Sequence, residues 1–302
     1  MRWIATPFVV VMVAAIAGGA AARPSASGDE LIAYQGNGKI YVIDPDGTGR
    51  RPIISNAGDL PLAWSPDAQQ IAFTPGIPGL RSPLSNPEID VAAADGTGVR
   101  LLTHGPSDTA AMPTWSPDGK QIAFEAWNDD EQRWAIYLIG ADGKGLRMLT
   151  HRGDDLSPDW SPDGRWIVFE RGIAGLLSMM VVHPDGTGLH RIARLIGGPQ
   201  CLCADWSPDG SKIAYQASTS LSTQRFPEIF VMNASGGGRT RLTRNRVRDE
   251  NPDWSPDGTR IAFYSERFGN AEIFVIDADG RNVRRITRDP WYSSLPRWRP
   301  SP

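Results

Sequence analysis

Little in this sequence points to catalysis or to nucleic-acid binding. Its 302 residues carry a formal net charge of -3, which argues against nucleic acid because phosphate contacts need a basic face. The patterns Gly-x-Ser-x-Gly and His-Glu-x-x-His are absent, and so is a glycine-rich phosphate loop. We therefore expect no catalytic residues and no enzymatic activity.

Cysteine is scarce, with Cys201 and Cys203 as the only two. Residues two apart on a regular strand share a face, but a direct bridge between them is strained. We favour a pair of small buried thiols and keep a disulfide as the alternative, since an exported protein can oxidise its cysteines. Two thiolates alone make a poor metal site, so neither a metal nor another cofactor is expected.

The first 22 residues have the pattern of a cleavable export signal. Arg2 supplies a positive charge, residues 8–17 are apolar, and Ala20 and Ala22 place small side chains before a cleavage site at Arg23. The alternative is a retained anchor, but the apolar run over residues 8–22 is shorter than the roughly 20 residues that span a bilayer. We expect a periplasmic or extracellular protein with no membrane insertion after cleavage.

An internal repeat dominates the rest of the chain. The tetrapeptide Trp-Ser-Pro-Asp begins at five tryptophans, and a decayed copy, Trp-Arg-Pro-Ser, begins at a sixth. The spacing runs from 44 residues (Trp254 to Trp298) to 51 residues (Trp64 to Trp115), which fits one four-stranded propeller blade per repeat. The remaining copies begin at Trp115, Trp160 and Trp206.

Each repeat contains four predicted strands, which we name A to D. In the copy that begins at Trp254, strand A ends at the tryptophan, and strands B, C and D cover residues 261–263, 273–276 and 285–287. Ser-Pro-Asp-Gly joins A to B, and an Asp-Gly turn joins C to D. Strands B and C are continuously apolar, which is typical of strands buried on both faces. We expect the repeated tryptophans to pack between blades.

The ends of the chain predict how the ring closes. Residues 31–34, 40–43 and 52–55 read as strands B, C and D of a first blade that lacks strand A. Residues 295–298 at the other end read as a lone strand A. Pairing the C-terminal strand with the N-terminal blade closes an all-β, six-bladed β-propeller of four-stranded antiparallel blades. We assign residues 1–22 to the signal peptide, 23–28 to a linker and 29–302 to the propeller.

One end of this ring varies from blade to blade. The A–B and C–D turns share one end and repeat with little change, whereas the B–C loops and D–A crossings share the other end and differ in every blade. Binding residues tend to lie on variable loops held by a rigid scaffold. The candidates for partner binding at this end are Trp127, Asp129, Asp130, Trp134, Asp154, Asp155, Arg246, Arg248, Asp249, Glu250, Asn251, Trp291 and Tyr292.

The segment from Trp254 to Thr287 resembles the WD40-like (PD40) repeat of the TolB family. Its Trp-Ser-Pro-Asp-Gly, Ile-Ala-Phe, Glu-Ile-Phe-Val-Ile-Asp-Ala-Asp-Gly and Arg-Arg-Ile-Thr stretches carry the likeness, which covers nearly all of residues 29–300. The resemblance implies a six-bladed propeller of the bacterial envelope that binds another envelope protein. Members of that family also carry an α/β domain before the propeller, where this sequence has only residues 1–28.

These observations favour an exported, non-enzymatic scaffold that binds an envelope or extracellular protein through the variable end of the ring. A closed propeller needs no second copy to be stable, so we expect a monomer. The alternative is a secreted hydrolase or lyase that acts on a polysaccharide, with its site at the mouth of the central channel. The two hypotheses differ in whether a bound protein or a turned-over glycan is found.

Overall fold

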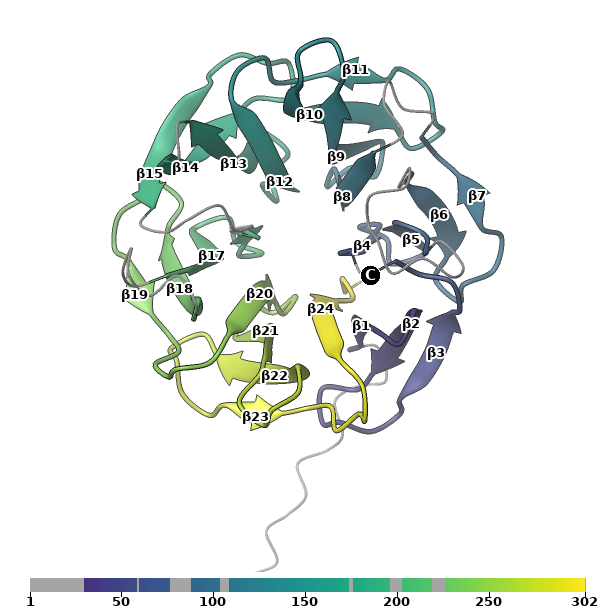
Figure 1. Cartoon of the computed structure of the whole chain (residues 1–302), viewed down its shortest axis with the longest axis vertical. Coiled ribbons are helices and arrows are strands. Elements are labelled where there is room, and N and C mark those ends of the chain that lie inside the picture. The colour runs from purple at the N-terminus through teal and green to yellow at the C-terminus, as the bar shows by residue number, and fades with distance from the viewer. Residues whose placement is uncertain are drawn as a thin grey trace, which may run out of the picture.

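A computed structural model describes residues 30–58, 60–76, 88–103, 109–173, 176–195, 203–218 and 226–301. Within these residues the protein is all-β, with 4-stranded antiparallel sheets as the blades of a six-bladed propeller (Figure 1). No helix in this part of the chain is long and apolar enough to cross a membrane. The predicted fold class is confirmed.

The first three blades follow the predicted order, with strand A innermost and strand D outermost. The first contains β24 (Ser293–Trp298), β1 (Ile32–Gly36), β2 (Lys39–Ile43) and β3 (Arg51–Ile54); the second contains β4 (Ala63–Trp64), β5 (Gln70–Phe73), β6 (Asp90–Ala93) and β7 (Arg100–Leu101); the third contains β8 (Ala110–Trp115), β9 (Gln121–Asn128), β10 (Arg133–Gly140) and β11 (Arg147–Met148).

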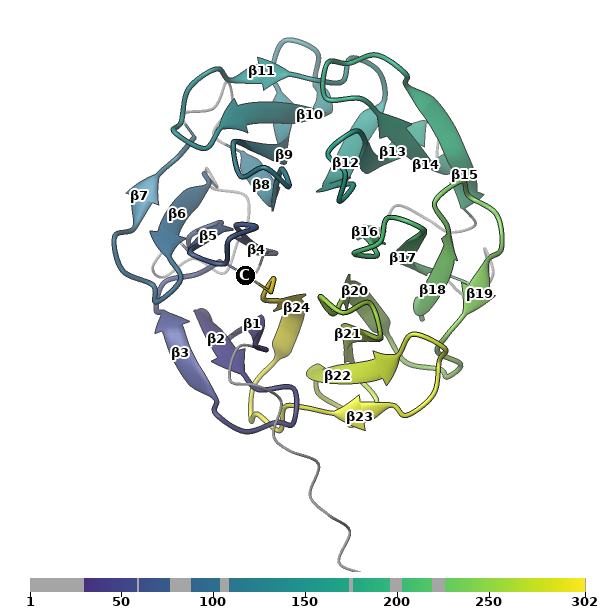
Figure 2. The same ribbon diagram turned by 180° about the vertical axis from the view of Figure 1, so that it is seen from behind.

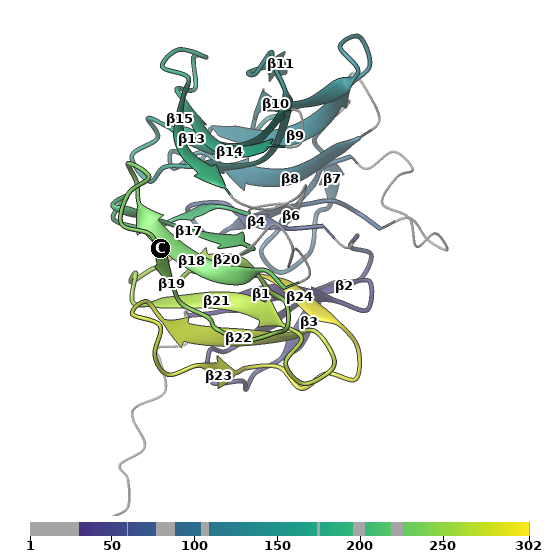
Figure 3. The same cartoon turned by 60° about the vertical axis from the view of Figure 1, so that its left-hand side comes forward.

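The last three blades repeat that order. The fourth contains β12 (Asp154–Trp160), β13 (Ile167–Ile173), β14 (Leu176–Val182) and β15 (His190–Leu195); the fifth contains β16 (Asp205–Trp206), β17 (Lys212–Ala217), β18 (Glu228–Asn233) and β19 (Thr240–Arg241); the sixth contains β20 (Asp249–Trp254), β21 (Arg260–Ser265), β22 (Glu272–Asp277) and β23 (Arg284–Arg285). Figure 3, turned by 60° from Figure 1, shows the longer strands, such as β21 and β22, running between the two ends of the ring.

The ring closes as predicted. Strand β24 pairs with β1 in antiparallel register, with Trp298 opposite Ile32 and Ser293 opposite Gly36. The C-terminal strand therefore becomes strand A of the first blade. This pairing removes the free edge that an open sheet would expose.

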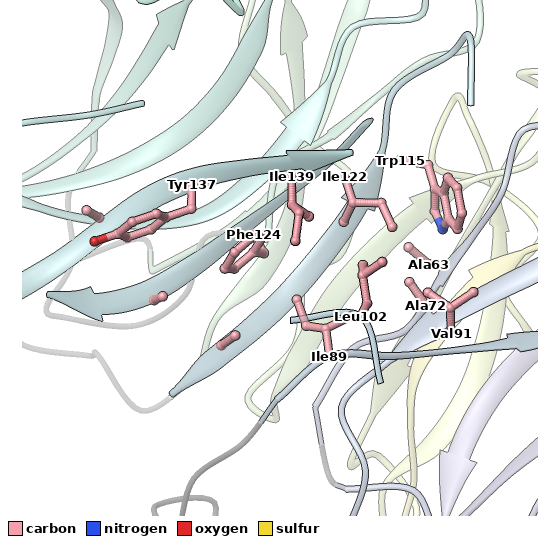
Figure 4. Packing of buried hydrophobic residues seen from close by; sticks show 13 residues of the cluster. Ala63, Ala72, Ile89, Val91, Leu102, Trp115, Ile122, Phe124, Tyr137 and Ile139 are labelled. Carbon is pink, nitrogen blue, oxygen red and sulfur yellow. The ribbon is translucent and has the colours of Figure 1, made fainter. Parts of the chain in front are cut away.

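The repeated tryptophans lie between blades, as expected. Trp115 of the third blade packs in one cluster with Ala63, Ala72 and Val91 of the second blade (Figure 4). All six ring tryptophans are between 5% and 9% exposed. Burying one such ring stabilises the fold by roughly 2–3 kcal/mol, so these residues contribute much of the core.

The outer strands end earlier than predicted. The prediction for blade six extended strand D to Thr287, but β23 ends at Arg285. The hydroxyl of Thr287 accepts the backbone N–H of Ile273 at 2.9 Å and donates to the carboxylate of Glu272. The backbone N–H of Ile286 still bonds the carbonyl oxygen of Ile273 at 2.8 Å, so the threonine replaces one of the two backbone bonds at this pair. In blades two, three and five a threonine hydroxyl just after strand D accepts a backbone N–H from the beginning of strand C in the same way.

Strand C of the second blade is also displaced from its prediction. Residues 88–91 were expected, but β6 spans Asp90–Ala93. Strand B of this blade, β5, ends at Phe73, which pairs with Asp90, so Ile89 has no partner residue on β5. The prediction was correct in placing a strand here and wrong by two residues in its bounds.

Candidate functional site

The antiparallel order of the strands gives the ring two unlike ends, which Figures 1 and 2 view in turn. We call one end the variable face; it consists of the B–C loops and D–A crossings with the strand ends beside them, and includes residues 129–132, 149–153, 242–248, 266–271 and 286–292. We call the other the turn face; it consists of the A–B and C–D turns, and includes residues 116–120, 141–146, 161–166, 183–189 and 278–283.

The third blade carries a pair of tryptophans on the variable face. Trp127 on β9 lies opposite Trp134 on β10, and their rings meet edge to face with centroids 6.0 Å apart. Both side chains are half-buried, while Asp129 and Asp130 at the tip of the hairpin are exposed. The carboxylate of the exposed Asp154 accepts the backbone N–H of Trp134 at 3.3 Å. The structure thus gathers five predicted residues into one acidic, aromatic cluster.

Asp155 lies beneath that cluster and is fully buried. Its two carboxylate oxygens receive the guanidinium of Arg171, from Nε at 2.6 Å and from Nη2 at 2.7 Å. Burial raises the pKa of Asp155, and Arg171 opposes that rise. Because Asp155 is buried and paired, it stabilises the crossing from the third to the fourth blade and does not offer a surface to a partner.

Asp249 has the equivalent place in the sixth blade. Its buried carboxylate accepts hydrogen bonds from Arg267 at 2.9 Å and from the amide of Asn245 at 2.6 Å. The neighbouring Glu250 is also buried, and it accepts the hydroxyl of Tyr264. Burial raises the pKa of Glu250. Both carboxylates therefore brace the loops of this blade from inside.

Asn251 lies deeper along the same strand, in a left-handed backbone conformation with φ of 54°. Its backbone N–H is accepted by the side chain of Gln216 at 2.6 Å, and its amide lies 2.9 Å from the sulfur of Cys203. These contacts join the sixth blade to the fifth. The role of Asn251 in partner binding remains a prediction.

The other predicted residues lie on blades six and one. Arg246 is exposed, and Arg248 is half-buried with its Nε 3.7 Å from Glu250. Trp291 is half-buried beside Tyr41, with ring centroids 6.1 Å apart, whereas Tyr292 is 65% exposed. This second cluster is rich in arginine and aromatic side chains. It lies across the ring from the cluster of the third blade (Figure 1).

Sequence reasoning missed a row of carboxylates in the central channel. Asp159, Asp205 and Asp253 each precede a repeated tryptophan, and each accepts the backbone N–H of the tryptophan in the next blade, at distances of 3.1, 2.6 and 2.5 Å. Burial raises the pKa of all three. The dipeptide Asp-Trp, present in three copies, was the signal that could have revealed them.

The channel around these carboxylates encloses a cavity of 420 Å³. Thr114 donates to Asp159 at 3.0 Å, and the guanidinium of Arg297 lies 3.6 Å from Asp253. Glu125 is buried nearer the variable face and accepts the N–H of Ser157 at 2.7 Å. Burial raises the pKa of Glu125 to about 7.

The favoured prediction of free thiols is wrong. Cys203 is disulfide-bonded, and Cys201, the other cysteine of the sequence, lies outside the described residues. Cys203 adopts a φ of 41°, a left-handed conformation instead of that of a regular strand. The geometry assumed for the prediction, in which both cysteines lie on one straight strand, therefore does not apply.

Within the described residues, no cluster of three or more histidine, cysteine, aspartate or glutamate side chains could hold a metal ion. His183 stacks on Trp166 of the turn face, with ring centroids 3.7 Å apart, and its Nδ1 lies 2.7 Å from the carbonyl oxygen of Arg165. His190 contacts the same indole edge to face. These two histidines pack locally against Trp166.

The sequence matches the TolB beta propeller domain (PD40) over residues 11–200 and 196–302. The chain belongs to this family. A crystal structure of TolB from Acinetobacter baumannii is similar, with 21% identity and a TM-score of 0.72 over 91% of this chain and 68% of that one. An oligogalacturonate lyase from Vibrio parahaemolyticus shares the fold at 14% identity, with a TM-score of 0.58 over 81% of this chain and 74% of that one.

A curated relative matches a smaller part of this PD40 propeller. Dipeptidyl-peptidase 5 from Porphyromonas endodontalis is 28% identical over 89 residues, which are 30% of this chain and 12% of the relative. The matched segment is thus a small fraction of that enzyme. These likenesses support the PD40 fold, and they leave the activity of the chain open because one fold carries many functions.

Proposed function

We propose that this chain is an exported, non-enzymatic scaffold that binds a protein of the cell envelope or the extracellular medium through its variable face. The observation that carries the proposal is the pair of clusters on that face, one around Trp127 and Trp134 and the other around Arg246 and Tyr292. Tryptophan, tyrosine and arginine are the side chains that contribute most to protein interfaces.

Buried ion pairs support this role by fixing the loops before any partner arrives. Arg171 anchors Asp155 beneath the first cluster, and Arg267 anchors Asp249 beneath the second. A partner then loses less free energy to the ordering of loops, because the ordering already exists in the free protein. A rigid, varied surface on a repetitive frame is what a binding scaffold requires.

The disulfide of Cys203 supports export. Disulfides persist in oxidising compartments and are rare in the cytosol. The apolar segment over residues 8–17, followed by small residues before Arg23, provides the corresponding export signal. Both features agree with a mature protein that works outside the cytoplasm.

Affinity capture from the producing cells tests the proposal. The bait is residues 23–302, compared with a variant that carries Trp127→Ala, Trp134→Ala, Arg246→Ala and Tyr292→Ala. A matched control carries Lys120→Ala and Lys144→Ala, two exposed changes on the turn face. We expect one protein that the unchanged bait and the control retain and the first variant loses.

Two results would count against the scaffold. Equal capture by all three baits would place binding elsewhere on the molecule. Empty captures, combined with turnover of a polysaccharide by the unchanged protein, would favour the enzyme instead. Each variant is first checked for an unchanged unfolding transition, so that a lost partner cannot be confused with a lost fold.

A further inference from the structure

Arginine side chains gather on one sector of the variable face. Arg244, Arg246 and Arg248 lie in the crossing from β19 to β20, and Arg288 lies in the crossing from β23 to β24. Arg244, Arg246 and Arg288 are exposed, and no ion pair among the described residues involves any of these three. We call this sector the basic rim; it consists of Phe226, Arg244, Arg246, Arg248, Phe268, Arg288 and Tyr292.

Most carboxylates in the segments of the rim are buried or paired, so they do not neutralise its exposed arginines. Asp249 is enclosed and paired with Arg267, and Asp289 is nearly enclosed and paired with Arg50. Glu250 is buried under the hydroxyl of Tyr264. Glu266 is the half-buried exception. The rim thus presents positive charge to solvent although the whole chain carries a net charge of -3.

Hydrogen bonds tie the segments of the rim into one surface. The N–H of Glu266 bonds the carbonyl oxygen of Arg248 at 3.1 Å, and the N–H of Asp249 bonds that of Pro227 at 3.0 Å. The amide of Asn270 donates to the carbonyl oxygen of Trp291 at 2.6 Å. Loops from blades five and six and the crossing to blade one are therefore held together, and the arginines extend from one connected backbone surface.

Exposed aromatic rings lie among these arginines. Phe268 is 62% exposed, with its ring parallel to that of Phe274 and the guanidinium of Arg285 4.7 Å from its centroid. Phe226 and Tyr292 are exposed as well. Phenylalanine has no polar atom for a sugar hydroxyl, whereas it readily packs against apolar side chains. This composition favours a polypeptide over a polysaccharide as the bound molecule.

We propose that the basic rim binds an acidic segment of a partner polypeptide. Its arginines pair with aspartate and glutamate carboxylates, which the planar guanidinium recognises through two hydrogen bonds, and its aromatic rings contact apolar side chains between them. Across the ring, the exposed Asp129, Asp130 and Asp154 repel such a segment and so fix its place on the face. This inference rests on the proposed function and names the class of its partner.

Fluorescence anisotropy with a labelled peptide of repeated Asp-Glu-Phe-Gly units tests the inference. The rim variant carries Arg244→Glu, Arg246→Glu and Arg288→Glu. The control carries Lys120→Glu, Lys144→Glu and Arg281→Glu on the turn face, where all three side chains are exposed, so both variants change the net charge equally. We expect the rim variant to bind at least roughly tenfold more weakly than the control. Added salt should weaken binding to the unchanged protein.

Four results would overturn the inference. Equal losses of peptide affinity in both variants would indicate attraction by net charge alone. If the unchanged protein did not bind the peptide, the rim would not be a site for acidic segments. Labelled polygalacturonate that binds where the peptide does not would replace the polypeptide by an anionic polysaccharide. A dimer that dissociates in the rim variant, seen by sedimentation, would assign the rim to a second copy of the chain.

The outcome separates this inference from the proposed function. If the peptide fails to bind but the four-residue capture variant still loses the partner, the scaffold stands and the acidic segment is wrong. If capture is independent of the whole variable face while the peptide binds the rim, the proposed function fails and the rim remains a site for acidic ligands. Failure of both assays rejects both statements.

Discussion

Arg171 and Asp155 lie opposite each other on paired strands and share two hydrogen bonds, Nε to Oδ1 at 2.6 Å and Nη2 to Oδ2 at 2.7 Å. Both side chains are buried. A buried carboxylate that loses its cation keeps the cost of desolvation without the compensating attraction. The pair therefore stabilises the folded conformation of the crossing into the fourth blade.

We expect Arg171→Ala to lower the free energy of unfolding by about 3–5 kcal/mol, because it leaves the carboxylate of Asp155 buried and unpaired. Urea denaturation followed by tryptophan fluorescence measures the change. Lys120→Ala removes an exposed ion pair with Asp118 and should cost less than about 1 kcal/mol. Equal effects of the two substitutions would show that the buried pair has no special weight.

The channel carboxylates predict a protein that is more stable in mild acid than in base. Burial raises the pKa of Glu125 from 4.5 to about 7 and that of Asp253 from 3.8 to about 7. Between those values the folded state binds more protons than the unfolded state, so the free energy of unfolding falls as pH rises. The stabilisation is fully present below about pH 4 and is lost as pH rises through 7.

Urea denaturation across this range measures the slope. Glu125→Gln and Asp253→Asn remove the titrating groups but keep an oxygen that accepts the backbone N–H of Ser157 or Trp298. We expect each substitution to flatten the dependence between pH 5 and pH 8 and to raise stability at the upper end. An unchanged slope in both variants would assign the pH dependence to other groups.

The ring tryptophans should be among the most sensitive positions of the fold. Trp254 packs between blades five and six against Ala214 and Ile229, and its backbone N–H donates to the carboxylate of Asp205. Trp254→Ala should lower the free energy of unfolding by about 3–5 kcal/mol through the cavity that it leaves. Tyr292→Ala, at an exposed position, should change stability by less than about 0.5 kcal/mol. Thermal and urea unfolding of both variants check the contrast.

The disulfide of Cys203 predicts a mature protein without free thiols. Thiol titration of the unfolded protein should give none before reduction and two afterwards. A disulfide between the two cysteines of the sequence, which are two residues apart, closes a very short loop, so its reduction should cost under about 2 kcal/mol of stability. Two free thiols in protein isolated from outside the cytoplasm would contradict the structure on this point.

The repeat made the fold predictable, because a tryptophan and a turn that recur at blade spacing define every sheet and the way the ring closes. The ends of the outer strands could not be predicted in the same way. They depend on Thr103 and Thr287, whose hydroxyls take over backbone hydrogen bonds that a regular strand would make. The strand propensity of a segment does not reveal that a side-chain hydroxyl will replace a backbone hydrogen bond.

The sequence allowed the location of the candidate residues to be predicted, but not the contacts that their side chains make. The sequence placed Asp155 and Asp249 at the variable face, but not the arginines that enclose them. Arg171 and Arg267 come from different positions relative to strand B, so no repeat pattern relates them. The exposed residues Arg246 and Tyr292 were accessible to sequence reasoning because the sequences of their crossings differ from those of the other blades.

Photo-crosslinking in the producing cells tests the central claim, that a protein binds the variable face, most directly. A photoreactive amino acid replaces Trp127 or Tyr292 on that face, and Thr187 or Asn282 on the turn face as exposed controls. The account predicts a discrete protein adduct from the first two positions and none from the controls. Adducts from Thr187 or Asn282 alone, or no adduct from any position, would contradict it.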